Sequence, residues 1–120
     1  NEMVRKKVEQ AARFGLIPVV CISDLSQLTG LQSYEDIIVA YEPPGAISTS
    51  GPNSSPENPH LVSEFASKVK EKLGVRVIYG GSVNANNIKE YLDLENISGA
   101  LVGGESLDHK SFINILKNAT

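Results

Sequence analysis

The sequence predicts a parallel α/β fold in which four strands alternate with helices. Four short runs are rich in Val and Ile and are separated by stretches whose apolar residues repeat with a helical period. Each run is apolar at successive positions, as expected for strands that are covered on both faces. Strands and helices that alternate along a chain form parallel sheets with helical crossovers.

The first part of the chain is predicted to contain one helix and two strands. Residues 2–14 carry an apolar helical stripe that ends before Gly15, a residue that favours helix termination. Residues 16–22 are expected to form a buried strand, residues 24–34 a short helical turn and loop, and residues 36–41 the next strand. The stripe of the first helix comprises Met3, Val4, Val8, Ala11 and Ala12.

The most strongly marked helix begins at Asn58 and Pro59. Asn is a favourable N-cap, Pro suits the first helical turn, and Gly74 provides the stop. The segment 75–79, VRVIY, follows as the third strand. The residues expected to face the core from this helix are Leu61, Val62, Phe65, Val69 and Leu73.

The last third continues the alternation. Residues 84–93 are predicted to form a short helix, residues 98–102 the fourth strand, and residues 109–118 a final helix. The core residues expected from these helices are Ala85, Ile88, Tyr91 and Leu92 in the first, and Phe112, Ile115 and Leu116 in the last.

Four strands leave the sheet incomplete. Helices cover one face, while the other face and both edges stay open unless something closes them. A closed (β/α) barrel needs eight strands. The sequence therefore predicts a single domain over residues 1–120 that is either a small open sheet or half of a barrel. A helix already under way at Asn1 indicates a fragment or a partial subunit.

Composition excludes several classes of partner. The chain is 41% hydrophobic and carries a formal net charge of −3, with a pI of about 5.3. This acidic balance does not favour nucleic acid or an anionic membrane as partner. The sequence has no run of about 18 apolar residues, and we expect neither a membrane-spanning helix nor a signal peptide.

One cysteine, Cys21, lies within the first of the four apolar runs, residues 16–22. A single cysteine permits no disulfide within the chain and offers too few ligands for a zinc site. We expect a buried thiol on a strand, a reducing compartment and therefore a cytoplasmic location. No metal and no cofactor are expected.

Polar and glycine-rich segments follow three of the predicted strands. Glu42 ends the second strand, Tyr79-Gly80-Gly81-Ser82 follows the third, and Gly103-Gly104 follows the fourth. Ligands of parallel α/β folds gather at the carboxyl ends of strands. Glycine pairs let backbone N–H groups approach an anion closely, so these ends predict a phosphate site beside a carboxylate.

The segment after Glu42 has the composition of a lid. Pro43 and Pro44 stiffen its start, and a run of Gly, Ala, Ser and Thr follows. A rigid hinge next to small residues suits a loop that closes over a ligand and excludes water.

Three segments resemble a known family. AYEPPGAISTSG, IYGGSVNANN and GALVGGESL occur in order at strand ends and resemble segments of the triosephosphate isomerases. The likeness covers nearly all of the chain, from that family's fourth helix to its eighth. It implies half of a TIM barrel and, in glycolysis and gluconeogenesis, interconversion of dihydroxyacetone phosphate and glyceraldehyde 3-phosphate.

The resemblance also implies roles for individual residues. Glu42 matches the general base that moves a proton between two carbons of the substrate. Residues that match phosphate contacts are Ser48, Ser82, Gly103 and Gly104. Residues that match the lid and the groups holding it closed are Pro43, Pro44, Gly45, Ala46, Ile47, Thr49, Tyr79, Gly80, Gly81 and Ser82.

The chain departs from the family pattern in its lid. Gly45 replaces a tryptophan, Ser48 and Ser50 replace glycines, and Gly51 replaces a lysine. The connection between residues 24 and 36 is also shorter than in the family.

The resemblance further implies that two catalytic groups lie in the missing half of the barrel. These are a lysine that binds substrate and a histidine that polarises its carbonyl. His60 and His109 begin predicted helices and are expected at the surface. We therefore expect little or no isomerase activity from the chain alone.

Two other functions remain open at this point. The chain could be a non-catalytic phosphate-binding half-barrel that self-associates, so that two copies close a barrel. It could also belong to another phosphosugar barrel enzyme, although Glu42 beside a lid sequence argues against this. The expected partners are a small phosphorylated triose, or phosphate itself, and either a second copy or a complementary N-terminal half-barrel.

Overall fold

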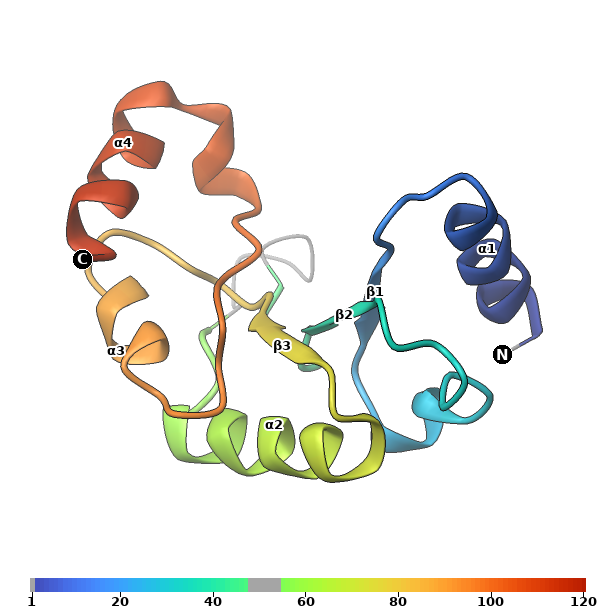
Figure 1. Ribbon diagram of the computed structural model, residues 1–120. Helices are drawn as coiled ribbons and strands as arrows, with labels where there is room; N and C mark the ends of the chain where they lie inside the picture. The colour runs from blue at the N-terminus through green and yellow to red at the C-terminus, as the bar shows by residue number, and fades with distance from the viewer. Residues whose placement is uncertain (1, 48–54) are drawn as a thin grey trace.

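The computed structural model describes residues 2–47 and 55–120, in which helices surround a small parallel sheet (Figure 1). The order of elements is α1 (Glu2–Arg13), β1 (Val19–Ile22), η1 (Leu25–Leu28), β2 (Ile38–Tyr41), α2 (Pro59–Leu73), β3 (Arg76–Tyr79), α3 (Ile88–Leu92), η3 (Gly104–Leu107) and α4 (His109–Asn118). The helices form an arc around the strands, with α1 and α4 at its two ends. No helix in the described part of the chain is long and apolar enough to cross a membrane.

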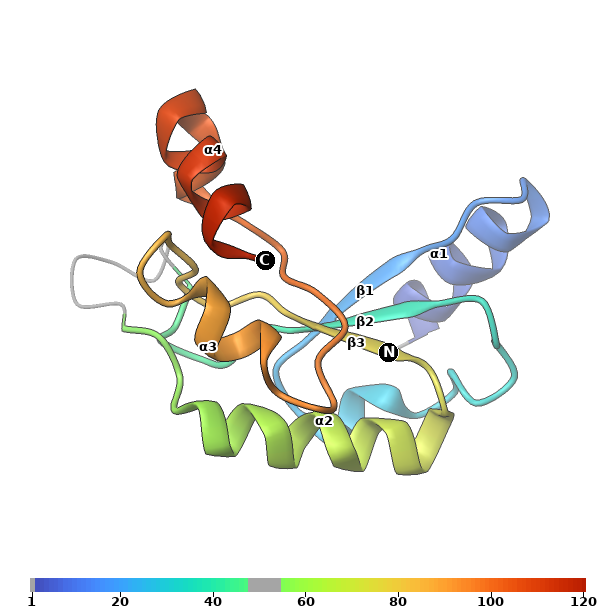
Figure 2. The same ribbon diagram turned by 60° about the vertical axis from the view of Figure 1, so that its left-hand side comes forward.

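The sheet has the order β1-β2-β3 with all pairs parallel, and the strands run side by side (Figure 2). The predicted fourth strand lies next to β3. Tyr79 donates its N–H to the oxygen of Gly99 at 3.0 Å, and Leu101 donates to the oxygen of Tyr79 at 2.8 Å. This segment makes only one bridge, between Tyr79 and Ala100, so it takes the fourth place in the sheet without forming a regular strand.

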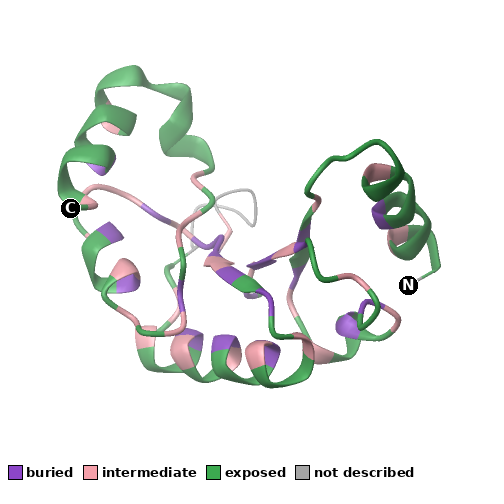
Figure 3. Cartoon of the chain, in the orientation of Figure 1, coloured by how far each residue is buried: buried purple, intermediate pink, exposed green. Residues whose placement is uncertain are grey.

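The face of the sheet turned toward α2 forms the core. Side chains alternate along a strand, and paired residues share a face. Val20, Val39 and Val77 are paired across the sheet and are all buried. They meet α2, whose Val62, Ala66 and Val69 are fully buried. Figure 3 shows burial along the strands and on the sides of the helices that face them.

The opposite face of the sheet is open along β1, whereas Ala40 at its centre is buried. Val19 is 47% exposed, and Cys21 on the same strand is also exposed. The expectation of a buried thiol at Cys21 is therefore wrong, because no second layer from residues 2–47 and 55–120 packs against this side of β1. Arg76, which shares the face, is exposed as well.

The predicted apolar stripes of the terminal helices are only partly buried. Val8 is the buried residue of α1, and Ile115 is the buried residue of α4. Leu116 remains 55% exposed, and Leu61 of α2 remains 49% exposed. These residues have the spacing of core positions, but the described part of the chain provides no layer to cover them.

The caps predicted for α2 are confirmed. The Asn58 side chain accepts the N–H of His60 at 2.9 Å. Gly74 adopts a φ of 69° and donates its N–H to Lys70 at 2.7 Å, which ends the helix. A positive φ of this kind is accessible to glycine at little cost.

The crossover between β1 and β2 is short and contains only η1. Asp24 caps it by accepting the N–H of Ser26 at 2.8 Å, and Gln27 completes a capping box. Leu28 and Leu31 are buried at 2% and 1% exposure. The crossover therefore buries apolar side chains against the sheet, although it lacks a full helix.

Candidate active site

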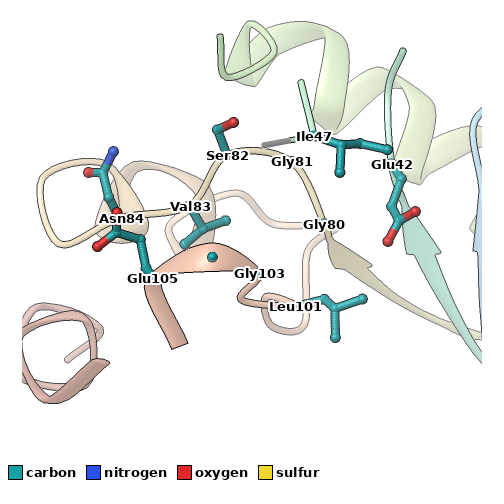
Figure 4. Close-up of a pocket in the computed structure, with 11 residues that line it drawn as sticks. Glu42, Ile47, Gly80, Gly81, Ser82, Val83, Asn84, Leu101, Gly103 and Glu105 are labelled. Carbon is teal, nitrogen blue, oxygen red and sulfur yellow. The ribbon is translucent and has the colours of Figure 1, made fainter. Parts of the chain in front are cut away.

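A pocket lies at the carboxyl ends of the strands and contains most of the described residues predicted to bind substrate (Figure 4). It is an open cavity of about 230 Å³. Its lining residues come from three strand ends and the loops that follow: Glu42, Ile47, Gly80, Gly81, Ser82, Val83, Asn84, Leu101, Gly103, Gly104 and Glu105.

Glu42 is placed by the sheet itself. Its backbone N–H donates to the oxygen of Ile22 at 2.8 Å, and Gly80 donates to the oxygen of Tyr41 at 2.8 Å. Both bonds extend the parallel ladder beyond the assigned strands, so the carboxylate stands on a rigid support. A rigid support keeps a catalytic group in one geometry.

Gly80 leaves the space in which the side chain of Glu42 lies. A Cβ added at Gly80 would stand 2.8 Å from Cγ of Glu42 and 3.4 Å from its Oε1. Any larger residue at position 80 would push the carboxylate away. The absence of a side chain at this glycine therefore fixes where the carboxylate of Glu42 sits.

Cys21 is the neighbour of Glu42 on the open face. Although part of its surface is exposed, partial burial raises the pKa of the Cys21 thiol to about 11, helped by hydrogen bonding to Glu42 and by the charge of that carboxylate. The raised pKa keeps the thiol protonated at neutral pH. This proximity was not predicted from the sequence. Cys21 lies near the end of β1 and Glu42 directly follows the adjacent parallel strand β2, and these positions could have indicated it.

Two tyrosines hold the chain just before α2. Tyr79 accepts the N–H of Glu57 at 2.9 Å, and Tyr91 donates its hydroxyl to the oxygen of Glu57 at 2.5 Å. Their rings are stacked with centroids 4.1 Å apart. Burial raises the pKa of both tyrosines, so both hydroxyls stay protonated at neutral pH. Tyr79 was predicted near the lid, whereas Tyr91 was expected only in the core.

Gly81 makes room for this arrangement. A Cβ at Gly81 would overlap the hydroxyl of Tyr79. The second glycine of this pair therefore accommodates a side chain from its own strand, while Gly80 accommodates Glu42.

The start of the predicted lid is tied to the third strand end. The Ser82 hydroxyl donates to the oxygen of Ala46 at 2.6 Å, and Ala46 closes a turn by donating to Pro43 at 3.1 Å. Gly45 has a φ of 82°, and its oxygen accepts the N–H of Ser55 at 3.2 Å. Pro44 is exposed. The predicted lid residues Ser48 and Thr49, with Ser50 and Gly51, lie outside the described residues.

Gly103 and Gly104 border the pocket where the fourth strand position ends. Gly103 precedes η3, and its oxygen accepts both the N–H and the hydroxyl of Ser106, at 2.9 and 2.6 Å. The next residue, Glu105, also lines the pocket. Sequence reasoning did not consider Glu105, although its position directly after the glycine pair was a usable signal.

The described lining of the pocket contains no Lys, Arg or His. His60 and His109 are both exposed, in the first turns of α2 and α4, and neither lines this pocket. Within residues 2–47 and 55–120, no group of three or more His, Cys, Asp or Glu side chains is arranged to hold a metal ion. The polar side chains of the described lining are therefore two carboxylates, Glu42 and Glu105, the hydroxyl of Ser82 and the amide of Asn84.

A parallel sheet with helices outside, and with a carboxylate and glycine pairs at the carboxyl ends of its strands, has the architecture of half of a (β/α) barrel. The sequence model of the triosephosphate isomerase family matches residues 1–119, and the chain belongs to this family. The predicted resemblance is thereby confirmed.

Relatives support the same conclusion. The chain is 36% identical to a triosephosphate isomerase of Dictyoglomus thermophilum over 145 positions, covering 98% of this chain and 58% of that protein. It is 35% identical to one of Mesomycoplasma hyopneumoniae strain 7448, covering 99% of this chain and 55% of that protein. The crystal structure of triosephosphate isomerase from Bartonella henselae superposes with a TM-score of 0.70 at 27% identity, covering 96% of this chain and 56% of that one.

The chain therefore spans little more than half the length of these relatives. The half-barrel prediction is confirmed by this partial superposition on a triosephosphate isomerase. The Dictyoglomus alignment runs over 145 positions, more than the 120 residues of this chain, so that relative carries residues that this chain lacks. The short crossover between β1 and β2 agrees with such a deletion.

Proposed function

We propose that this chain is the half of a triosephosphate isomerase that carries the general base and the phosphate cup. A complementary N-terminal half completes the barrel, and the assembled protein interconverts dihydroxyacetone phosphate and glyceraldehyde 3-phosphate. The observation that carries this proposal is that one pocket contains Glu42 together with the two glycine pairs.

Glu42 moves the proton in this proposal. Its carboxylate removes a proton from the carbon next to the substrate carbonyl and returns it to the neighbouring carbon, so carbonyl and hydroxyl exchange places. The neutral Cys21 thiol is a neighbour of this carboxylate, whose presence contributes to the raised pKa of the thiol. A general base has to lie within hydrogen-bond reach of the proton that it takes. The sheet holds Glu42 at the carboxyl end of β2, beside the pocket.

The phosphate group binds at the glycine-rich ends in this proposal. Ser82, Gly103 and Gly104 line the same pocket, and their side chains are small or absent, which favours access to their backbone N–H groups. Such N–H groups suit a phosphate oxygen. Binding there would hold the reacting carbons toward Glu42.

The chain alone is expected to be inactive. The described pocket residues include no cation and no histidine to stabilise the negative charge that develops on the substrate oxygen. Removing one such group commonly costs about 10²–10³ in rate. The proposed N-terminal half supplies the lysine and the histidine. A cytoplasmic location, where Cys21 stays reduced, is part of the same proposal.

Complementation tests the proposal. The chain is mixed with the N-terminal half of the Dictyoglomus relative, and isomerisation is followed in a coupled assay. We expect activity from the mixture that neither half shows and that Glu42→Gln abolishes. A physical complex without turnover, or turnover that survives Glu42→Gln, would contradict the assigned role of the base.

The uncovered surface favours a second candidate, a self-associated phosphate-binding half-barrel. Val19 at the β1 edge and Leu101 at the opposite edge are 47% and 37% exposed, and both edges run in the same direction. Two copies related by a two-fold axis would pair these edges. The assembly would hold two copies of Glu42 but neither the lysine nor the histidine. Sedimentation distinguishes a self-associated dimer from a monomer that assembles only with the other half.

A further inference from the structure

We propose that Glu105 selects the charge of the anion that the phosphate cup accepts. Its carboxylate weakens binding of a doubly charged phosphate ester more than binding of a singly charged one. This inference rests on the proposed function, because it assumes that the glycine-rich pocket binds phosphate.

The position of Glu105 carries the argument. It directly follows Gly104 in the short helix η3 and lines the same pocket as Gly80 and Ser82. Figure 4 shows Glu105 at one end of the pocket, next to Asn84, and Glu42 at the other end. Two carboxylates therefore border the glycine-rich floor from opposite sides.

Nothing within the described chain neutralises this second acid. The three ion pairs of the described residues join neighbouring turns of α1, α2 and α3, and none includes Glu105. Glu105 is exposed and makes no hydrogen bond through its side chain with the described residues. Its charge therefore acts on whatever occupies the pocket.

The composition of the pocket lining gives the charge of Glu105 a large influence on anion binding. Attraction for an anion has to come from neutral donors, such as backbone N–H groups and the amide of Asn84, because the described lining contains no Lys, Arg or His. Two acids then oppose the anion. Repulsion between fixed charges scales with the charge of the ligand, so Glu105 opposes a dianion about twice as strongly as a monoanion, in free energy. One acid, Glu42, serves the proposed proton transfer, whereas Glu105 has no such role.

The effect can be measured on the full 120-residue chain without the missing half. Methyl phosphate at pH 8 carries two charges, and methyl sulfate carries one with the same tetrahedral shape. Each is titrated into ¹⁵N-labelled protein, and affinities are taken from the backbone amide shifts of Gly80, Ser82 and Gly103. The variants are Glu105→Gln, Glu105→Asp and, as a control with the same change in net charge, Glu95→Gln. Glu95 is exposed and does not line the pocket.

We expect Glu105→Gln to bind methyl phosphate roughly tenfold more tightly and methyl sulfate roughly threefold more tightly, since repulsion follows ligand charge. Glu105→Asp should keep the discrimination of the wild type, and Glu95→Gln should match the wild type for both ligands. A merely structural role for Glu105 would change both affinities by the same factor.

Two results would overturn the inference, and they differ in what else they overturn. If both ligands bind at the glycine pairs but Glu105→Gln behaves like Glu95→Gln, Glu105 selects no charge and the phosphate cup stands. If neither ligand shifts these amides in any variant, both the cup and the inference are wrong.

Discussion

Replacing Gly80 with alanine tests whether an absent side chain positions the catalytic base. In the structure, the new Cβ would stand 2.8 Å from Cγ of Glu42 and 3.4 Å from the oxygen of Tyr41. Carbon atoms in contact rest about 3.5–4.0 Å apart. The side chain of Glu42 therefore has to move by about 1 Å, because the Tyr41 oxygen belongs to the sheet backbone and cannot yield.

The expected cost to folding is small, and the expected cost to function is large. Glu42 is only half-buried and borders an open pocket, so its side chain can yield. We expect a loss of about 1 kcal/mol in the free energy of unfolding, at the low end for overpacking. A displacement of about 1 Å at a reacting group can reduce a rate about 10²-fold.

Two assays measure the displacement. In the complex with an N-terminal half, the turnover of Gly80→Ala is compared with that of the wild type. In the chain alone, alkylation of Cys21 reports on its contact with Glu42, and we expect it to become faster. Gly99→Ala is the matched control, because its Cβ would meet Ile78 at 3.3 Å and stays away from the carboxylate.

The reasoning would be refuted if Gly80→Ala retained the turnover and the Cys21 reactivity of Gly99→Ala at equal stability. Such a result would mean that Glu42 can occupy its functional position with a methyl group beside it. Urea unfolding of both variants establishes that they are compared as folded proteins.

Three further predictions concern the contacts around the pocket. Glu42→Gln should make alkylation of Cys21 at pH 8 several-fold faster, roughly as expected when a carboxylate that raises the thiol pKa is removed; an unchanged rate would show that the two groups do not interact. The folded state raises the pKa of Cys21 to about 11, so the stability gained from the neutral thiol is complete below its unfolded value and is lost as pH rises toward 11. The difference in urea midpoint between wild type and Cys21→Ser should therefore shift in that range, whereas a constant difference would argue against a perturbed thiol. Tyr91→Phe leaves the Glu57 oxygen without its donor and should lower the free energy of unfolding by about 1 kcal/mol, with faster amide exchange at Glu57.

Much of the fold could be predicted from local signals. Asn58 and Gly74 mark the ends of α2 through capping and a left-handed turn, which depend on a few neighbouring residues. The strands β1, β2 and β3 lie within the predicted apolar runs. The segment 98–102 was predicted as a strand but makes only one bridge to β3 among the described residues. Its conformation depends on pairing with β3, which local sequence patterns do not specify.

Burial could be predicted less well than element type. Periodicity identified Val62 and Val69 correctly, but it also assigned Leu61 to the core. Cys21 was expected to be buried and is exposed. An apolar stripe indicates which side of a helix or strand favours burial. That side is buried only where another element packs against it.

The candidate site divides in the same way. Glu42 and the glycine pairs were predicted as a group, because parallel strands place their carboxyl ends at one edge. Tyr91 and Glu105 were not predicted as members of the site. Tyr91 reaches Glu57 across 34 positions of sequence, and such a distant contact leaves no local pattern.

The order of amino acids alone determined the alternation of strands and helices, the helix ends, and the residue types at the strand termini, since each depends on short-range sterics and hydrogen bonding. Tertiary packing decided which apolar faces are buried, that Cys21 and Glu42 are neighbours, and that Glu42 lies over Gly80. These features depend on atoms brought together from separate strands, so their distances exist only once the sheet has formed.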